Sequence, residues 1–391
     1  MTLQELMTRW NGYQIEMRRW FHQHPEESTK EVRTAERIRA ELDRAGIPWR
    51  PCGLGTGTLA RIEGAQPGRT ILLRGDIDAL SVNEETGLPY ASEVPGVMHA
   101  CGHDCHISML LTAAMIVNEI RDRLKGTIVF AFQPAEELGL GARAMIEEGA
   151  LEGVDACFGM HVWSDYPAGT VALRKGPMMA SGDQFKIHVR GKSTHGAQPQ
   201  LGADALIMGA AIAQNLQTIV SRETYPGDTA VVTVGKFHSG TRFNVVAGTA
   251  ELEGTTRTFS PAVRDRFEEQ ITRIARSTAE AMRGTADVEY LRIVPVTVND
   301  PGMIDVVTGA AGKIFGDKGV IEADLQMGGE DFAFYQEKVP GAMVLLGVRN
   351  EACAAAWPQH HGCYKVDESV LVKGAALHVQ TALDFLGVDL Q

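Results

Sequence analysis

Three histidines, two cysteines and an aspartate lie within one short run of the chain, from His99 to His106. Histidine nitrogen and cysteine sulfur are ligands that divalent transition metals prefer. Cys101 and His103 are two residues apart, so a turn or an extended segment would let both side chains converge on one ion. A cysteine and a histidine at this spacing, with no other ligand types nearby, are more often a buried cysteine and a structural histidine. Here the density of ligand types favours a metal site.

Residues of the same chemical kind recur far along the chain. Glu136 and Glu137 follow one strand-like run, His161 ends another, and His360 and His361 lie near the C-terminus in a loop that contains proline and glycine. Such scattered ligands indicate one site assembled by the fold, not a small zinc-binding module. Either ring of the C-terminal pair could reach this site.

Two adjacent carboxylates, such as those of Glu136 and Glu137, repel each other and destabilise the fold unless cations compensate their charge. Beside a metal, one carboxylate can bind the ion while the other takes a proton from a metal-bound water. The alternative is a helix N-terminus enriched in acidic residues. His106 opens the next predicted helix, where it can be a ligand, a capping residue or a surface residue.

Other polar side chains suggest supporting roles. Asp76 and Asp78 follow a buried strand, at the sheet edge where open α/β folds place their sites, although a solvated turn would give the same pattern. Asp104 could orient the imidazole of the neighbouring histidine. Four further residues are candidates. His195 lies in a loop and, taken alone, indicates only a surface histidine, and Asn244 offers an amide. Arg257 suits a substrate carboxylate, and Asp331 either supports the site or caps a helix.

The elements that must position these residues follow two patterns. Continuous apolar runs at 69–74, 126–132 and 157–162 alternate with helical patterns at 106–120 and 141–148, which predicts an α/β layer with both sheet faces covered. The middle of the chain instead predicts half-exposed strands and two helices, at 183–190, 203–220, 229–234, 250–258, 261–283 and 288–298. We therefore expect a catalytic domain of two segments, 1–181 and 293–391, and a small α+β domain inserted at 182–292.

Composition limits the class of protein. The chain has 391 residues, which favours two domains. The net charge of −12 and the lack of a Lys/Arg block argue against nucleic acid or an anionic membrane as partner. No apolar stretch is long enough for a transmembrane helix, and residues 1–21 form an amphipathic pattern rather than a secretory signal. A cytoplasmic protein with free thiols is the expectation.

Taken together, the motifs resemble those of the metal-dependent aminoacylase/carboxypeptidase superfamily, in particular its N-acyl-amino-acid amidohydrolases, hippurate hydrolases and plant auxin-conjugate hydrolases. The resemblance spans nearly the whole chain in family order. It is carried by Arg19-Trp-Phe-His22-Gln-His-Pro25-Glu26, Leu73-Arg74-Gly-Asp76-Ile-Asp78-Ala-Leu80, Met98-His-Ala-Cys101-Gly-His103-Asp104, Gln133-Pro-Ala-Glu136-Glu137, Gly159-Met-His161, Gly254-Thr-Thr-Arg257 and Gly329-Glu330-Asp331-Phe332.

The resemblance implies a mixed-sheet catalytic domain with helices on both faces, and an inserted ferredoxin-like lid and dimerisation domain. It implies two divalent metal ions, manganese, zinc, cobalt or nickel, held by Cys101, His103, Glu137, His161 and His360. It makes Glu136 the general base, with Asp76, Asp78, Asp104 and Asp331 as supporting residues. It also implies that His195 crosses to the partner's site in a homodimer, with further pairing into a tetramer as the alternative, and that Asn244 and Arg257 hold the substrate.

Two departures affect the C-terminal part of the site. Gly362 stands where the family usually has proline after its histidine motif. His360 is preferred over His361 because Tyr364 and Asp367-Glu368 then fall in register. The segment 350–358, with three successive alanines and Trp357, matches no family motif and is a candidate to shape a substrate pocket.

The function expected from this resemblance is hydrolysis of N-acetyl, N-benzoyl or indoleacetyl amino acids. A dipeptidase or carboxypeptidase would use the same chemistry on a different pocket. A non-catalytic binding protein on the same fold is a further alternative, which loss of Glu136 would have favoured. The last alternative is an enzyme with Cys101 as nucleophile, which chelators would not inhibit because a thiol nucleophile needs no metal.

Overall fold

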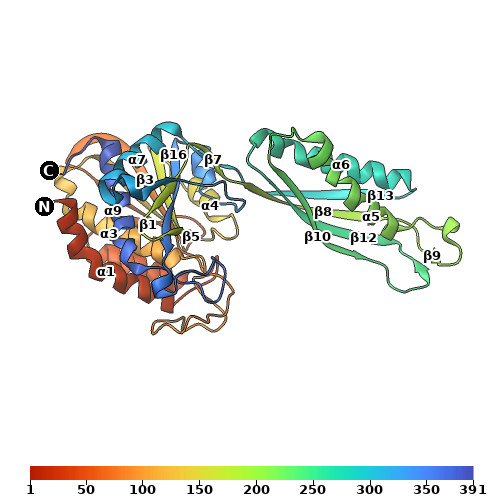
Figure 1. Cartoon of the computed structure of the whole chain (residues 1–391), viewed down its shortest axis with the longest axis horizontal. Helices are drawn as coiled ribbons and strands as arrows, with labels where there is room; N and C mark the ends of the chain where they lie inside the picture. The colour runs from red at the N-terminus through yellow and green to blue at the C-terminus, as the bar shows by residue number, and fades with distance from the viewer. Residues whose placement is uncertain (391) are drawn as a thin grey trace. The chain divides into compact units, whose positions relative to one another are not determined.

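The computed structural model describes residues 1–390 and divides into two compact units (Figure 1). The first consists of Met1–Gly176, Val298–Asp324 and Asp331–Gln391, and the second of Pro177–Thr297 and Leu325–Glu330. The short return segment 325–330 packs with the second unit, although it lies beyond the sequence range expected for the inserted domain. Each unit has its own hydrophobic core.

The first unit is built on an eight-stranded mixed sheet with the order β1-β2-β4-β3-β5-β16-β6-β15. Its centre is four parallel strands, β4 (Lys125–Gln133), β3 (Gln66–Asp76), β5 (Ala156–Pro167) and β16 (Gly341–Arg349). The flanking strands are β1 (Trp49–Pro51), β2 (Thr58–Glu63), β6 (Val171–Leu173) and β15 (Val320–Glu322). The three continuous apolar runs are all central strands, as expected for strands covered on both faces.

Helices pack against this sheet and against each other (Figure 1). They are α1 (Leu3–Gln23), α2 (Val32–Arg44), α3 (His103–Glu119), α4 (Gly141–Glu147), α7 (Pro301–Phe315), α8 (Ala333–Gln336) and α9 (Leu371–Leu386). The α3 helix is buried along nearly its whole length, because it lies between the sheet and its neighbours α1 and α9. None of the described helices is long and apolar enough to cross a membrane.

The helix α3 begins three residues earlier than its apolar pattern predicts, at His103 rather than His106. The first turn of α3 is largely polar and shows no apolar periodicity, so the sequence pattern does not reveal where the helix begins. Gly102 precedes it with φ 85°, a left-handed conformation that glycine adopts without strain. A Cβ there would lie 2.4 Å from Val162 Cγ2 and 3.0 Å from Tyr364 Oη. The glycine therefore permits both the turn and the close packing that starts the helix.

The second unit is a four-stranded antiparallel sheet in the order β10-β12-β8-β13, with two helices packed on it. Its elements are β8 (Ser181–Arg190), α5 (Ala205–Asn215), β10 (Ala230–Ser239), β12 (Thr249–Thr258), α6 (Pro261–Ala281) and β13 (Thr285–Val294). The alternation of β8 places Phe185, Ile187 and Val189 in the core, as its pattern predicts. The predicted helix 203–220 was too long, since a separate π-helical turn (Ile219–Glu223) follows α5.

A buried ion pair anchors α6 to the sheet of the second unit. Arg264 donates from Nε and a terminal nitrogen to both carboxylate oxygens of Asp183, at 2.9 and 2.7 Å. Asp183 also accepts from the Tyr290 hydroxyl at 3.0 Å and from the Ile293 amide at 3.1 Å. Removal of the cation would leave a carboxylate buried without its compensating charge.

We predict that Arg264→Leu destabilises the protein by about 3–5 kcal/mol, because breaking one side of a buried pair leaves an uncompensated charge. Arg266→Leu, at an exposed position of the same helix, is the matched control. Urea unfolding followed by circular dichroism measures both. Equal midpoints for the two variants would show that the buried pair does not stabilise this unit.

Candidate metal centre and active site

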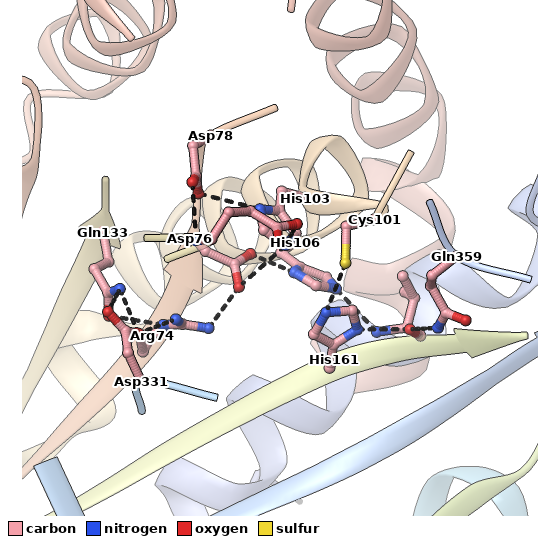
Figure 2. A network of polar contacts seen from close by, with 12 residues as sticks. Arg74, Asp76, Asp78, Cys101, His103, His106, Gln133, His161, Asp331 and Gln359 are labelled. Atoms are coloured by element: carbon pink, nitrogen blue, oxygen red, sulfur yellow. Dashed lines mark hydrogen bonds and ion pairs between the residues drawn. The ribbon is translucent and has the colours of Figure 1, made fainter. Parts of the chain in front are cut away.

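The candidate site lies at the carboxyl ends of the central parallel strands of the first unit, where α/β sheets commonly place their sites. Asp76 ends β3, Gln133 ends β4, and His161 lies within β5. Cys101, in the turn before α3, and His103, the first residue of α3, lie at the same place (Figure 2). The chain thus gathers residues from four distant segments at one sheet edge.

The five side chains that the sequence predicts as ligands lie close together. Ligand atoms of Cys101, His103 and Glu137 are all within 4.8 Å of one another. The Cys101 sulfur lies 3.4 Å from His161 Nε2. His360 Nε2 lies 3.5 Å from a Glu137 carboxylate oxygen, so the C-terminal loop reaches the cluster.

Hydrogen bonds set the orientation of the His103 ring. Its Nδ1 lies 3.2 Å from Asp78 Oδ1, so the Nδ1–H donates there and Nε2 is the ring nitrogen turned toward the cluster. Asp78 is itself fixed by the Ser28 hydroxyl at 2.6 Å and the Glu137 amide at 3.1 Å. Among the described residues, nothing offers a hydrogen bond to His103 Nε2 or to the buried oxygen Oε1 of Glu137. These two buried atoms lie 3.9 Å apart, a spacing that one cation bound to both of them would fit.

His161 presents a free lone pair. Its Nδ1 donates to the carbonyl of Val162 at 2.7 Å, which leaves Nε2 on the side of the Cys101 sulfur. Burial, aided by the neighbouring ring of His106, lowers the pKa of His161 well below its usual value, so the imidazole is neutral. A neutral imidazole with a fixed tautomer is the form that binds metal.

The excess of negative charge in the cluster also favours a bound cation. Burial acts to lower the pKa of His103, but nearby carboxylates, Asp76 first among them, outweigh it and raise this pKa to about 10. Burial and the charges of Glu137 and Glu136 raise the pKa of the Cys101 thiol well above its usual value. The protein atoms alone would therefore hold protons at both positions. A metal ion would supply the missing positive charge and favour the thiolate.

His106 has both ring nitrogens engaged. The Val162 amide donates to Nε2 at 2.9 Å, so the proton is on Nδ1, which donates to Asp76 Oδ1 at 2.5 Å. The structure thus favours a supporting role over the ligand, capping and surface roles that the sequence left open. Through Val162, this ring holds the part of β5 that carries His161. The strand continues to Pro167 and so does not end at His161 as the sequence suggested.

The two C-terminal histidines also differ. The Cys363 amide donates to His361 Nδ1 at 3.0 Å, and the His361 ring stacks on Trp357. His360 adopts a left-handed φ of 65°, and its amide donates to the carbonyl of Ala100 at 2.8 Å. This contact ties the C-terminal loop to the cysteine–histidine run and favours His360 as the ligand.

Asp104 orients a different imidazole from the one that the sequence suggested. It contacts His22 Nδ1 at 2.8 Å and Arg18 Nε at 3.0 Å, while Asp78 is the partner of His103. Burial opposes the ionisation of Asp104, but Arg18 and His22 outweigh it and hold the pKa of that carboxyl far below its usual range. The sequence indicated His22 only as part of a family motif and gave it no role, so this network between α1 and α3 was not predicted.

Asp331 supports the sheet edge from below the cluster (Figure 2). Arg74 bridges Asp76 at 2.6 Å and Asp331 at 2.9 Å, and all three side chains are buried. Asp331 also accepts from the Gln133 side chain at 2.7 Å and from the Ala142 amide at 3.0 Å. The sequence suggested supporting roles for the two acids but none for Arg74 or Gln133, whose only signal was their place within the motifs.

Glu136 lies in a constrained turn directly after β4. It is 9% exposed, and its carboxylate lies within 4.8 Å of that of Asp331. Ala135, just before it, has a φ of 50° and donates its amide to Glu31 at 2.9 Å. Left-handed backbone at a non-glycine residue is strained and concentrates at functional sites. The turn fixes the direction of both glutamates.

Three predicted substrate or catalytic residues belong to the second unit. His195 is exposed on the short strand β9 (Thr194–His195), with Nδ1 accepting from the Ala197 amide at 3.0 Å. Asn244 has a buried side-chain oxygen to which no described residue donates. Arg257 is half-buried and donates to the Thr255 hydroxyl at 2.9 Å. Their roles toward substrate stay predictions.

We predict that Asp78→Asn weakens metal binding by about 10–100-fold, because outer-shell partners fix the tautomer and basicity of ligating imidazoles. Asp122→Asn, on the exposed 3-10 turn η1 (Arg121–Arg123), is the matched control. Competition with a chromogenic chelator measures the affinity of each variant for Zn²⁺. An unchanged affinity in the Asp78 variant would remove this residue from the metal centre.

Known proteins are similar to this chain in sequence. The chain is 41% identical over 368 residues to N-acetyl-L-cysteine deacetylase of Bacillus subtilis, covering 94% of this chain and 87% of that protein. It is 36% identical to the IAA-amino acid hydrolase ILR1-like 4 of Arabidopsis thaliana, covering 96% and 86%. Both relatives therefore align along nearly the whole chain, through both units.

A solved structure gives the same result. The Bacillus subtilis YXEP protein, described as a dinuclear metal-binding peptidase, superposes with a TM-score of 0.86 at 36% identity and covers 98% of this chain and 100% of its own. The model of peptidase family M20/M25/M40 matches residues 72–384, which include all the metal-cluster residues. This chain therefore belongs to peptidase family M20/M25/M40.

Proposed function

We propose that this protein is a metal-dependent amidohydrolase that cleaves the amide bond of N-acyl amino acids. The observation that carries the proposal is the buried cluster of sulfur, imidazole and carboxylate ligands, next to a second glutamate in the same constrained turn. The activities named for the deacetylase and the auxin-conjugate hydrolase support an acylated amino acid as substrate class.

Two divalent ions would be held by the five clustered side chains, Cys101, His103, Glu137, His161 and His360. Manganese, zinc, cobalt and nickel all suit a set of imidazole and carboxylate ligands, and the thiolate favours the softer ions among them. When bound, such ions would polarise the amide carbonyl and lower the pKa of water, so that water loses a proton and becomes a nucleophile at neutral pH.

Glu136 would move the protons. Its carboxylate takes one proton as water attacks the amide carbon and gives it to the departing nitrogen, so that a free amino acid leaves as a neutral amine. Glu137 cannot share this task, because its carboxylate is committed to the cluster. The adjacent acids therefore have separate roles.

An attack by Cys101 itself is less consistent with the geometry. A nucleophilic cysteine needs a lowered pKa and access to substrate, whereas burial raises the pKa of Cys101 and its sulfur lies against His161. Inhibition by chelators would separate the two mechanisms.

The second unit would supply recognition and assembly. We propose that Arg257 binds the substrate carboxylate, that Asn244 helps to hold it, and that His195 of one subunit stabilises the oxyanion in the partner's site. A homodimer through this unit would cover its exposed apolar side chains, Leu201, Leu206, Ile207, Phe237 and Phe243. Further pairing into a tetramer and a cytoplasmic location stay predictions.

The test is hydrolysis of N-acetyl, N-benzoyl and N-indoleacetyl amino acids, with dipeptides in the same panel. Metal-stripped protein is assayed alone and with Mn²⁺, Zn²⁺, Co²⁺ or Ni²⁺. We expect turnover of acylated amino acids only after metal is restored. Turnover confined to dipeptides would instead favour a peptidase, the activity named for the YXEP protein, and no turnover at all would favour a binding role.

A further inference from the structure

Trp357 presents an aromatic surface close in the chain to the candidate ligand His360. Its side chain is 46% exposed, which is unusual for so large an apolar group. Its ring stacks on that of His361, with centroids 4.4 Å apart and planes at 15°. Stacked pairs at this spacing hold a ring in a defined orientation. The exposed part of the indole is therefore a fixed surface rather than a mobile side chain.

The loop that carries Trp357 is fastened to the strand that carries His161. The Gln359 side chain donates to the Val162 carbonyl at 3.1 Å and accepts from the Ser164 hydroxyl at 2.7 Å. This organisation before binding reduces the entropy that a ligand must overcome. Gln359, two residues after Trp357, thus anchors this loop beside the cluster.

Two more exposed apolar side chains follow the glutamate pair in the chain. Leu138 is next to Glu137 and is 49% exposed, and Leu140, two residues further on, is 45% exposed. The loops of Glu137 and His360 meet where those two side chains approach to 3.5 Å. We define Leu138, Leu140 and Trp357 as the apolar rim.

The chemistry of the apolar rim decides which half of the substrate it suits. An N-acyl amino acid has one half that carries a carboxylate and one that carries the acyl group. The carboxylate needs a cation, and none of the rim residues provides one, whereas Arg257 of the second unit could. The acyl group has no charge, and its apolar surface gains free energy when it leaves water.

We propose that the apolar rim binds the acyl half of the substrate and that Trp357 selects flat aromatic acyl groups over acetyl. This inference rests on the proposed function, the hydrolysis of N-acyl amino acids. A benzoyl or arylacetyl ring can stack on the fixed indole and cover its exposed area. An acetyl methyl group is too small to cover that area, so it gains little from the rim.

The experiment compares kcat/KM for N-benzoyl and N-acetyl derivatives of one amino acid in wild type, Trp357→Ala and Trp357→Phe. We expect Trp357→Ala to lower the value for the benzoyl substrate at least about tenfold and that for the acetyl substrate by no more than about twofold. Trp357→Phe keeps an aromatic face and should restore most of the benzoyl activity.

Equal losses on both substrates would overturn the proposal, since they would show that Trp357 only supports the loop. An unchanged benzoyl activity in Trp357→Ala would overturn it too, because the acyl group would then bind elsewhere.

A second measurement separates this inference from the proposed function. Calorimetric titration of the zinc-loaded protein with benzoate and with acetate needs no turnover. If the wild type hydrolyses none of the acylated amino acids, the proposed function fails. A preference for benzoate that Trp357→Ala abolishes would still support the aromatic surface, and equal binding of the two acids by the wild type would overturn it.

Discussion

Replacement of Glu136 by Gln is expected to lower the rate of amide hydrolysis by about 10³–10⁴-fold, while the protein keeps its metals. The amide is nearly the same size as the carboxylate but cannot accept the proton from water, and a positioned general base contributes up to about this factor. The ligand atoms of Cys101, His103 and Glu137 lie on other side chains, so the cluster itself stays complete. Steady-state kinetics and metal analysis by plasma emission spectrometry measure the two effects.

Glu147→Gln provides the matched control. Glu147 is exposed on α4, a few residues further along the same segment, and the same change of charge there should leave the rate within about twofold. If the Glu136 variant retained more than a tenth of wild-type activity, proton transfer would belong to another residue. If it lost its metals, Glu136 would have to be counted among the ligands.

The second large effect concerns the C-terminal histidines. We expect His360→Ala to weaken the binding of at least one metal ion more than about 100-fold and to abolish most hydrolysis, since removing a ligand should cost at least as much as removing its outer-shell partner. His361→Ala should keep its metals, because its Nδ1 accepts from a backbone amide and its ring stacks on Trp357.

Metal content after dialysis against a weak chelator distinguishes the two variants. Loss of metal from the His361 variant with retention in the His360 variant would reverse the assignment. Equal retention in both would mean that the contact between His360 and Glu137 does not reflect a shared ion.

The central strands of the first unit could be predicted from the sequence because they are covered on both faces. A strand such as β4 is apolar without interruption, and nothing but a buried position suits that pattern. The start of α3 could not be found in the same way. Its first turn, His103 to Cys105, is buried but polar or small, so apolar periodicity begins only afterwards.

The proximity of the candidate ligands could be predicted from the sequence, but the contacts that support them could not. Cysteine, histidine and glutamate residues near the ends of predicted strands can be recognised in the sequence as candidate metal ligands by their chemistry. The partner of Asp104 is His22, which lies 82 residues away on another helix, and the partner of His103 is Asp78 rather than the adjacent acid. Neighbours in sequence are a poor guide here, because successive residues of a helix point in different directions.

The second unit shows a similar limit. The strict alternation of β8 identified its buried face, whereas the end of α5 near Asn215 was missed. The residues after Asn215 stay apolar, so composition alone gave no stop signal, and the chain changes to a π-helical turn through its packing.

The left-handed glycine between the two proposed ligands of the metal run has a consequence for protein engineering. Any side chain at Gly102 would collide with Val162 and Tyr364 before it affected the metal. The backbone conformation that sets the spacing of Cys101 and His103 thus depends on the packing of Val162 and Tyr364, which come from distant parts of the chain. A library that varies only the ligands would explore one geometry, and a centre reshaped for another ion would need Val162 and Tyr364 reduced in size at the same time.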